Sequence, residues 1–382
     1  MKKLLILTSM RTGGGHVSLT EAIDEAFKGM EGVQTRVVDG FDLMSPTMRW
    51  LLADSYGLIT RRSWLLWLWR LGYRTVEAHP GLSVRVFETV CCRRFLALAA
   101  NFQPDGILAV NPCFCSSVIN IMEKKGRRVP LMCLQADLIN IPSTWFDKRT
   151  ALNFALTQEA YDYSLRKGMS PQRMAMLGFP VRKRFYATEQ ERAKPLPRYP
   201  RRILLMGGAE GAGNFVGAAH ALLAATECQL TIVCGRNKKL KTHLEKTLLP
   251  RYGARARVLG FVSNMREEMA QADLIVMRGS PNSAMEAAAM NKPLIITDSL
   301  PGQEADNPKV LAKHGLCILQ PDPDALPETI RTLFDPSNPT LKRMREAQRA
   351  YMDPACASRI AQRIADSIGR QPRDRSGAVV RS

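Results

Sequence analysis

The first half of the chain alternates short apolar runs with longer stretches in which apolar residues recur every three to four positions. Short runs bounded by turn residues are typical of strands buried on both faces, and the longer period is typical of helices. The predicted strands are Leu4–Thr8, Gln34–Asp39, Gly106–Val110, Val129–Leu134 and Phe154–Leu156, and the predicted helices are Val17–Phe27 and Gly81–Ala100. Such alternation favours a parallel sheet.

The same alternation begins again after a charged stretch that contains three prolines. The predicted strands of this half are Ile203–Met206, Leu230–Cys234, Arg257–Leu259, Leu274–Met277 and Leu294–Thr297, and the predicted helices are Phe215–Thr226, Lys238–Leu248, Met265–Ala270 and Ser283–Met290. The pattern therefore predicts an α/β fold of two Rossmann-like domains that face a cleft.

The composition shifts give the expected domain boundaries. They are a first domain at 1–186, a linker at 187–201, a second domain at 202–352, a helix packing back on the first domain at 353–370 and a disordered tail at 371–382.

The charge balance is strongly basic, with 54 Lys and Arg against 35 Asp and Glu. This surplus attracts polyanions such as nucleic acid, anionic lipid or a nucleotide, and charge alone does not choose among them. The nine cysteines include no C-x-x-C pair and no histidine at zinc spacing, so we expect reduced thiols and no metal site. No apolar run approaches the roughly 18 residues of a membrane span, so we expect a soluble or peripheral protein.

Two glycine-rich turns follow predicted strands, at Gly13–His16 and at Gly207–Gly213. Glycine lets the backbone approach a ligand closely, and a strand, glycine turn and helix start together form a common phosphate-binding unit. The second turn lacks the G-x-x-x-x-G-K-[ST] spacing of a P-loop, which disfavours an ATPase. His16 stands where a general base is expected, although a tight turn with a histidine at a helix start is the plain alternative.

A third pattern follows two later strands. The stretch 277–287 places Glu286 one turn into a helix, where a carboxylate suits ribose hydroxyls, and the stretch 301–307 carries amides and an acid that suit a sugar. A solvated loop and an ordinary first-turn glutamate are the alternative interpretation.

Four of the five tryptophans lie in residues 49–74, namely Trp50, Trp64, Trp67 and Trp69. Tryptophan and flanking arginine favour a bilayer interface, and the segment is too short and too charged to span one. A buried helical hairpin and a partner-protein contact stay open as alternatives.

These segments, taken in order, resemble the monogalactosyldiacylglycerol synthase and diacylglycerol glucosyltransferase group, relatives of the family 28 lipid II-forming glycosyltransferase with GT-B architecture. The resemblance spans roughly residues 3 to 320. The matching pieces are Thr12–His16, Gln135–Asp137, Trp145–Phe146, Leu177–Arg182, Gly207–Gly213, Ser280–Ala287 and Pro301–Asn307. This chain departs from the group at Ala136, Pro142, Arg278 and Ser280–Ser283. Those departures concern the sugar and the acceptor more than the fold.

The resemblance implies an inverting hexosyltransferase that moves a sugar from a UDP-sugar to a lipid, with diacylglycerol as the expected acceptor. It implies no cofactor, because the UDP-sugar is the donor substrate. It also implies that an anionic membrane surface is a partner and that the protein is cytoplasmic and peripheral, on the inner face of the cell membrane. His16 is the expected base, with Asp137 as the other candidate. The expected donor-binding residues are Gly14, Gly15, Gly207, Gly208, Gly211, Arg278, Ser283, Glu286, Gln303, Glu304 and Asn307. The expected membrane or acceptor contacts are Trp64, Trp67, Trp69 and Trp145. A UDP-sugar 2-epimerase on the same fold and a basic nucleic-acid-binding module are the two alternative functions.

Overall fold

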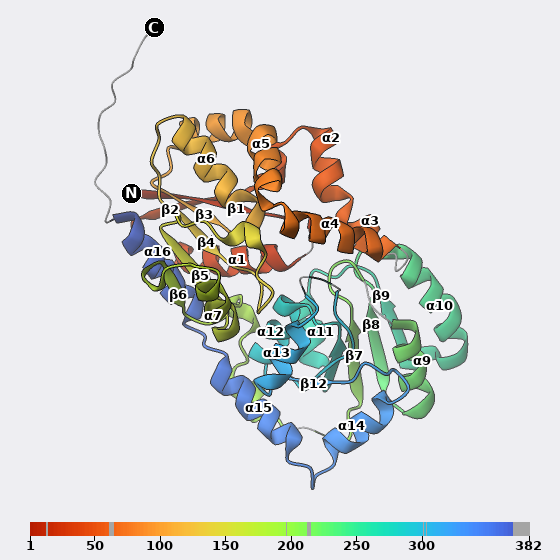
Figure 1. The fold of residues 1–382 in the computed structure, drawn as a ribbon. Helices are drawn as coiled ribbons and strands as arrows, with labels where there is room; N and C mark the ends of the chain where they lie inside the picture. The colour runs from red at the N-terminus through yellow and green to blue at the C-terminus, as the bar shows by residue number, and fades with distance from the viewer. Residues whose placement is uncertain are drawn as a thin grey trace.

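A computed structural model of the chain describes residues 1–12, 14–60, 65–195, 197–211, 215–300, 302 and 304–369. It contains two domains, each built on a six-stranded parallel sheet, which confirms the predicted α/β architecture. Figure 1 shows the first domain in red to yellow above the second domain in green to blue.

The first sheet has the strand order β2-β1-β3-β4-β5-β6. Its strands are β1 (Lys2–Thr8), β2 (Val33–Asp39), β3 (Gly106–Ala109), β4 (Leu131–Leu134), β5 (Leu152–Ala155) and β6 (Met174–Met176). Helices cover both faces of such a sheet, so its central strands are apolar on both sides, and Leu4 to Leu7 are fully buried. The edge strand β6 is only three residues long, and the sequence pattern did not predict it.

The helices of this domain include a long insertion between β2 and β3. They are α1 (Gly15–Lys28), α2 (Pro46–Arg49), α3 (Tyr56–Thr60), α4 (Leu66–Ala78), α5 (Pro80–Phe102), α6 (Ser116–Lys124) and α7 (Gln158–Arg166), with a π-helical turn at Trp50–Asp54. Among the described residues, no helix is both long enough and apolar enough to cross a membrane.

The second sheet has the strand order β12-β11-β10-β7-β8-β9. Its strands are β7 (Arg202–Met206), β8 (Gln229–Val233), β9 (Ala256–Leu259), β10 (Leu274–Met277), β11 (Leu294–Ile296) and β12 (Ile318–Leu319). Its helices are α9 (Phe215–Ala225), α10 (Lys238–Tyr252), α11 (Met265–Gln271), α12 (Pro281–Ala289), α13 (Asn307–Lys313), α14 (Leu326–Phe334) and α15 (Thr340–Tyr351). All neighbouring strands pair in parallel, so the carboxyl ends of the strands share one edge.

The chain passes twice between the domains. The first passage contains the short helix α8 (Glu189–Ala193), which a capping box at Thr188 begins inside the predicted linker. The second passage leads to α16 (Cys356–Gly369), which returns to the first domain (Figure 1). There Lys2 Nζ donates to the carbonyl of Ala365 at 2.8 Å, and a Cβ on Gly106 would lie 2.7 Å from Ile368. Residues 370–382, where we expect a disordered tail, lie outside the described residues.

Candidate active site between the two domains

His16 occupies the second position of α1, directly after the first glycine-rich turn. Its Nδ1 lies 2.7 Å from the carbonyl oxygen of Val110, and a carbonyl only accepts, so Nδ1 carries the proton. Nε2 therefore keeps its lone pair, and the Asn111 amide lies 3.4 Å from it. Burial lowers the pKa of His16 to about 4. The imidazole is thus neutral at pH 7, and Nε2, which the Asn111 amide contacts, is the ring atom that can take up a proton, as a general base requires.

The second glycine-rich turn follows β7 and uses its glycines for their conformation. Gly208 and Gly211 have φ of 69° and 59°, which L side chains rarely adopt. A Cβ on Gly211 would also lie 1.9 Å from the carbonyl oxygen of Cys234. The turn is therefore packed against the end of β8 in a shape that only glycine permits.

Replacing Gly211 with alanine should lower the free energy of unfolding by about 3 kcal/mol, because backbone strain and steric overlap add. Gly126 is a matched control with φ of 65° and nothing within 4 Å of its added Cβ. Gly126→Ala should cost only about 1 kcal/mol. Thermal denaturation of both variants measures the difference, and equal losses would contradict the close packing of the second turn.

The two glycine-rich turns meet across the domain boundary. A Cβ on Gly14 would lie 3.5 Å from the Ala209 side chain, and one on Gly15 would lie 2.6 Å from the amide nitrogen of Asn282. Asn282 is in the first turn of α12, and Ser283 beside it is half-buried. Gly14, Gly15, Gly208 and Gly211 thus lie in facing turns, as the interpretation of a shared site requires.

A polar cluster lies at the carboxyl edge of the second sheet, close to Gly208. Arg278 follows β10, and its Nη2 lies 3.5 Å from the Glu304 carboxylate. Asn307 begins α13 and is fully buried. Among the described residues, three buried atoms of this cluster have no hydrogen-bond partner: the amide nitrogen and oxygen of Asn307 and the Nε of Arg278. Unpaired buried polar groups are costly, so this arrangement suits a polar ligand that supplies the missing partners.

Glu286 is also buried, but its carboxylate faces a protein cation. The Arg182 guanidinium lies 2.5 Å from Glu286 Oε1 and joins it to α1 of the first domain through Glu21. Burial raises the pKa of Glu286, and the charge of Arg182 opposes that rise.

The other first-domain candidates lie deeper than expected. Asp137 is almost fully buried after β4. Burial, Glu77 and Asp137 together raise the pKa of Tyr73 on α4, so the Asp137 carboxylate lies near enough to this helix to act on its tyrosine. Trp145 is completely buried in the core of the first domain. The expectation that Trp145 contacts a membrane is therefore wrong, because its indole packs inside the domain.

The insertion between β2 and β3 carries an exposed apolar surface. Its apolar side chains are each more than half exposed, and they are Trp50, Leu51, Trp67, Leu71 and Leu82. Arg70, Arg74 and Arg85 are exposed on the same helices. A buried hairpin is therefore excluded for these positions. We call this set of eight residues the apolar insertion surface.

A charge network joins this insertion to the first glycine-rich turn. Arg11, two residues before that turn, lies 2.8 Å from Asp42 and 3.2 Å from Asp54, at the end of the π-helical turn that begins with Trp50. These ion pairs thus connect the start of the insertion to the segment that leads into the loop of His16.

Some expected residues are not described by the structure. Gln303 and Trp64 lie outside the described residues, and the side chain of Trp69 does as well, although its backbone is part of α4. Among the residues that are described, no cluster of His, Cys, Asp or Glu is arranged to hold a metal ion.

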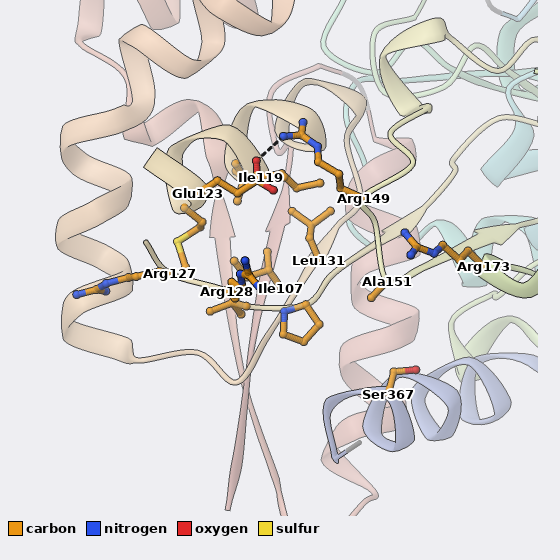
Figure 2. A pocket seen from close by; sticks show the side chains of 14 residues that line it. Ile107, Ile119, Glu123, Arg127, Arg128, Leu131, Arg149, Ala151, Arg173 and Ser367 are labelled. Atoms are coloured by element: carbon orange, nitrogen blue, oxygen red, sulfur yellow. Dashed lines mark hydrogen bonds and ion pairs between the residues drawn. The ribbon is translucent and has the colours of Figure 1, made fainter. Parts of the chain in front are cut away.

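A cavity of about 480 Å³ lies away from these residues, at the amino ends of β3, β4 and β5. Figure 2 shows Arg127, Arg128, Arg149 and Arg173 around an apolar floor that includes Ile107 and Leu131. Arg149 is paired with Glu123 at 2.6 Å, and Arg173 binds backbone carbonyls of Lys148 and Thr150. Because ligands of parallel α/β sheets bind at the carboxyl ends of strands, this cavity is not the candidate active site.

Comparison with known families covers most of the chain. Residues 16–181 match the family described as monogalactosyldiacylglycerol (MGDG) synthase, and residues 202–364 match the glycosyltransferase family 28 C-terminal domain. Each half of the chain is thus similar to this group of glycosyltransferases. The resemblance found in the sequence is thereby confirmed.

The sequences of named relatives align with nearly the whole chain. A probable chloroplastic MGDG synthase of Nicotiana tabacum is 29% identical over 90% of this chain and 66% of its own length. The chloroplastic MGDG synthase of Spinacia oleracea is 27% identical over 97% of this chain and 73% of its own length. The chain thus spans about two thirds to three quarters of the length of these relatives.

Solved structures share the two-domain fold at low identity. The S. aureus MnaA–UDP co-structure has a TM-score of 0.64 at 14% identity, and covers 97% of this chain and 99% of its own. A. baumannii MurG has a TM-score of 0.59 at 14% identity, and covers 96% of this chain and 100% of its own. Since both are far below 25% identity, they establish the fold alone, and the likeness to epimerases such as the one from Neisseria meningitidis adds no functional support.

The structure adds site residues that the sequence pattern did not assign. Asn111 contacts the ring of His16, and Arg182 pairs with Glu286. A polar residue directly after the buried strand β3 is a usable signal for Asn111. Arg182 stands within a matched segment, but its partner on α12 is visible only in three dimensions.

Proposed function

We propose that this protein is an inverting glycosyltransferase of the MGDG synthase family, and that it moves a hexose from a UDP-sugar to diacylglycerol or a related lipid. The observation that carries the proposal is the buried cluster of Arg278, Glu304 and Asn307, which lies beside the second glycine-rich turn at Gly208 and has unpaired polar atoms. The names of the relatives, MGDG synthases, supply the lipid class.

In this proposal the donor lies on the second domain. Backbone N–H groups of the Gly207–Gly211 turn and the start of α12 stabilise the diphosphate, as glycine turns and helix starts do for anions. Glu286 accepts from a ribose hydroxyl, and Arg278, Glu304, Asn307 and Gln303 bind the sugar.

The acceptor hydroxyl is deprotonated by His16 Nε2 as its oxygen attacks the anomeric carbon. The bond between that carbon and the β-phosphate oxygen breaks, and UDP leaves with the electron pair from the opposite face. Val110 accepts from Nδ1–H and thereby supports the imidazolium that forms. Asp137 remains the second candidate for the base, and its burial within the first domain fits a role on the acceptor side.

The acceptor is a membrane lipid, so the enzyme works at a lipid surface. The apolar insertion surface combines exposed tryptophan and leucine with arginine, which suits the interface of an anionic bilayer. We include in the proposal that the protein binds the inner, cytoplasmic face of the cell membrane as a peripheral protein.

The direct test incubates the purified protein with UDP-galactose or UDP-glucose and diacylglycerol in anionic vesicles. We expect UDP release that requires diacylglycerol, and a hexosyl lipid identified by mass spectrometry. Conversion of UDP-N-acetylglucosamine without any lipid would instead identify a 2-epimerase, and no turnover of any nucleotide sugar would reject the proposal.

A further inference from the structure

The ion pair between Arg182 and Glu286 joins the two domains at the candidate ribose site. Arg182 stands just before the first passage between the domains, and Glu286 stands on α12 of the second domain. Their side chains are 13% and 6% exposed. An ion pair this well shielded from water has a geometry fixed by its surroundings.

Arg182 is held from three sides. Its Nη2 and Nε lie 2.5 Å and 3.2 Å from Glu286 Oε1, and its Nη1 lies 2.8 Å from Glu21 Oε2 on α1. The guanidinium also lies over the ring of Phe185 at 4.7 Å. Because all these contacts fix one rotamer, the arginine has little freedom to turn elsewhere.

The two hydrogen bonds from Arg182 to Glu286 end on the same carboxylate oxygen, Oε1. Neither is directed to Glu286 Oε2, so the guanidinium orients the carboxylate without covering both of its oxygens. The side chain of Ser18 on α1 adds a hydrogen bond to the same carboxylate.

The protonation state of Glu286 depends on its burial and on the charged and polar groups around it. Burial raises its pKa, and Arg182, Ser18 and Arg184 lower it. Glu21 is the acidic group on the first domain that shares Arg182. Without Arg182 the buried carboxylate would take up a proton more readily and become a poorer acceptor for a hydroxyl.

We propose that Arg182 is a positioning residue for the donor ribose: it fixes the ionised Glu286 so that Oε2 accepts a ribose hydroxyl, and links that contact to the first domain through Glu21. This inference rests on the proposed function, in which Glu286 binds the ribose. The arginine acts through Glu286, so its effect depends on the hydroxyls of the ligand.

The test compares UDP with 2′,3′-dideoxy-UDP, which lacks both ribose hydroxyls, by calorimetric titration of the wild-type protein and Arg182→Gln. We expect the variant to bind UDP about 10- to 100-fold more weakly at pH 7, the size of one charge-assisted hydrogen bond. Its affinity for the dideoxy analogue should be unchanged. The loss for UDP should shrink as the pH rises, because Glu286 then ionises without the arginine.

Equal losses for both ligands would overturn the inference, because they would place the effect of Arg182 on the diphosphate or on the fold. The matched control is Arg257→Gln, since Arg257 pairs with buried Glu268 at 2.9 Å on β9 and α11. This variant should bind both ligands like the wild-type protein. Should Arg182→Gln fail to fold by circular dichroism, Arg182→Lys takes its place, with a smaller loss that is again specific to UDP.

Glu286→Gln separates this inference from the proposed function. If Glu286→Gln binds UDP as well as the wild-type protein does, the ribose site itself is wrong, and both proposals at this position fail. If Glu286→Gln weakens UDP binding while Arg182→Gln does not, only the role of Arg182 is rejected.

Discussion

Replacing His16 with alanine is expected to lower kcat by about 10²- to 10⁴-fold, the usual contribution of a general base. The reason is the fixed tautomer, since Nδ1 donates to Val110 and leaves Nε2 as the only ring atom that can accept a proton. The affinity for UDP should stay the same, because His16 acts on the acceptor hydroxyl. Steady-state kinetics with UDP-sugar and lipid vesicles measures kcat, and titration measures the UDP affinity.

His243→Ala is the matched control for this variant. His243 is exposed on α10 of the second domain, so its loss should leave both quantities unchanged. A His16→Ala protein that is folded and turns over at nearly the normal rate would remove His16 from the chemical step. Asp137→Asn would then be the variant to examine for the base.

The double substitution Trp50→Ser and Trp67→Ser is expected to weaken binding to anionic vesicles by about 30-fold. Slightly more than half of each tryptophan is exposed in the free protein. Inserting that exposed part into the membrane should contribute about 1 kcal/mol of binding free energy per residue, or about 2 kcal/mol for both. Cosedimentation with vesicles measures the partitioning. Activity on vesicle-borne lipid should fall with it, whereas UDP affinity in the absence of vesicles should not change.

Leu249→Ser serves as the control, because Leu249 is an exposed apolar residue on α10, outside the apolar insertion surface. Its vesicle binding should equal that of the wild-type protein. Normal vesicle binding by the double tryptophan variant would show that another face of the protein contacts the lipid.

Much of the fold was predictable because buried parallel strands leave a local signature. Leu4–Leu7 and Leu274–Met277 are continuous apolar runs, and each is followed within a few residues by a turn that leads into a helix. The sequence pattern also predicted that the glycines of both turns, together with Arg278, Glu304 and Asn307, follow strands, since the carboxyl ends of parallel strands gather at one edge. Their role in binding stays a prediction.

The remainder depends on contacts between distant segments. Nothing near Trp145 in the sequence distinguishes an indole that is fully buried from one at a membrane, whereas Trp50 and Trp67 are exposed. The pairing of Arg182 with Glu286 spans the passage between the domains and follows from how the two sheets are placed. The three-residue strand β6 is too short for a periodic pattern to reveal.

The two passages of the chain between the domains lie against each other. The Tyr186 hydroxyl donates to the carbonyl of Asp353 at 2.9 Å, and a Cβ on Gly178 would lie 3.5 Å from Cys356 Sγ. Because the two crossings are joined, we expect any relative motion of the domains to be a rotation about one axis that passes close to them. Arg182 stands four residues from Tyr186, so we expect it to lie near this axis and to move little. If the proposed nucleotide enters by such a rotation, we expect the loops far from this axis to move most and the pair of Arg182 and Glu286 to stay closed.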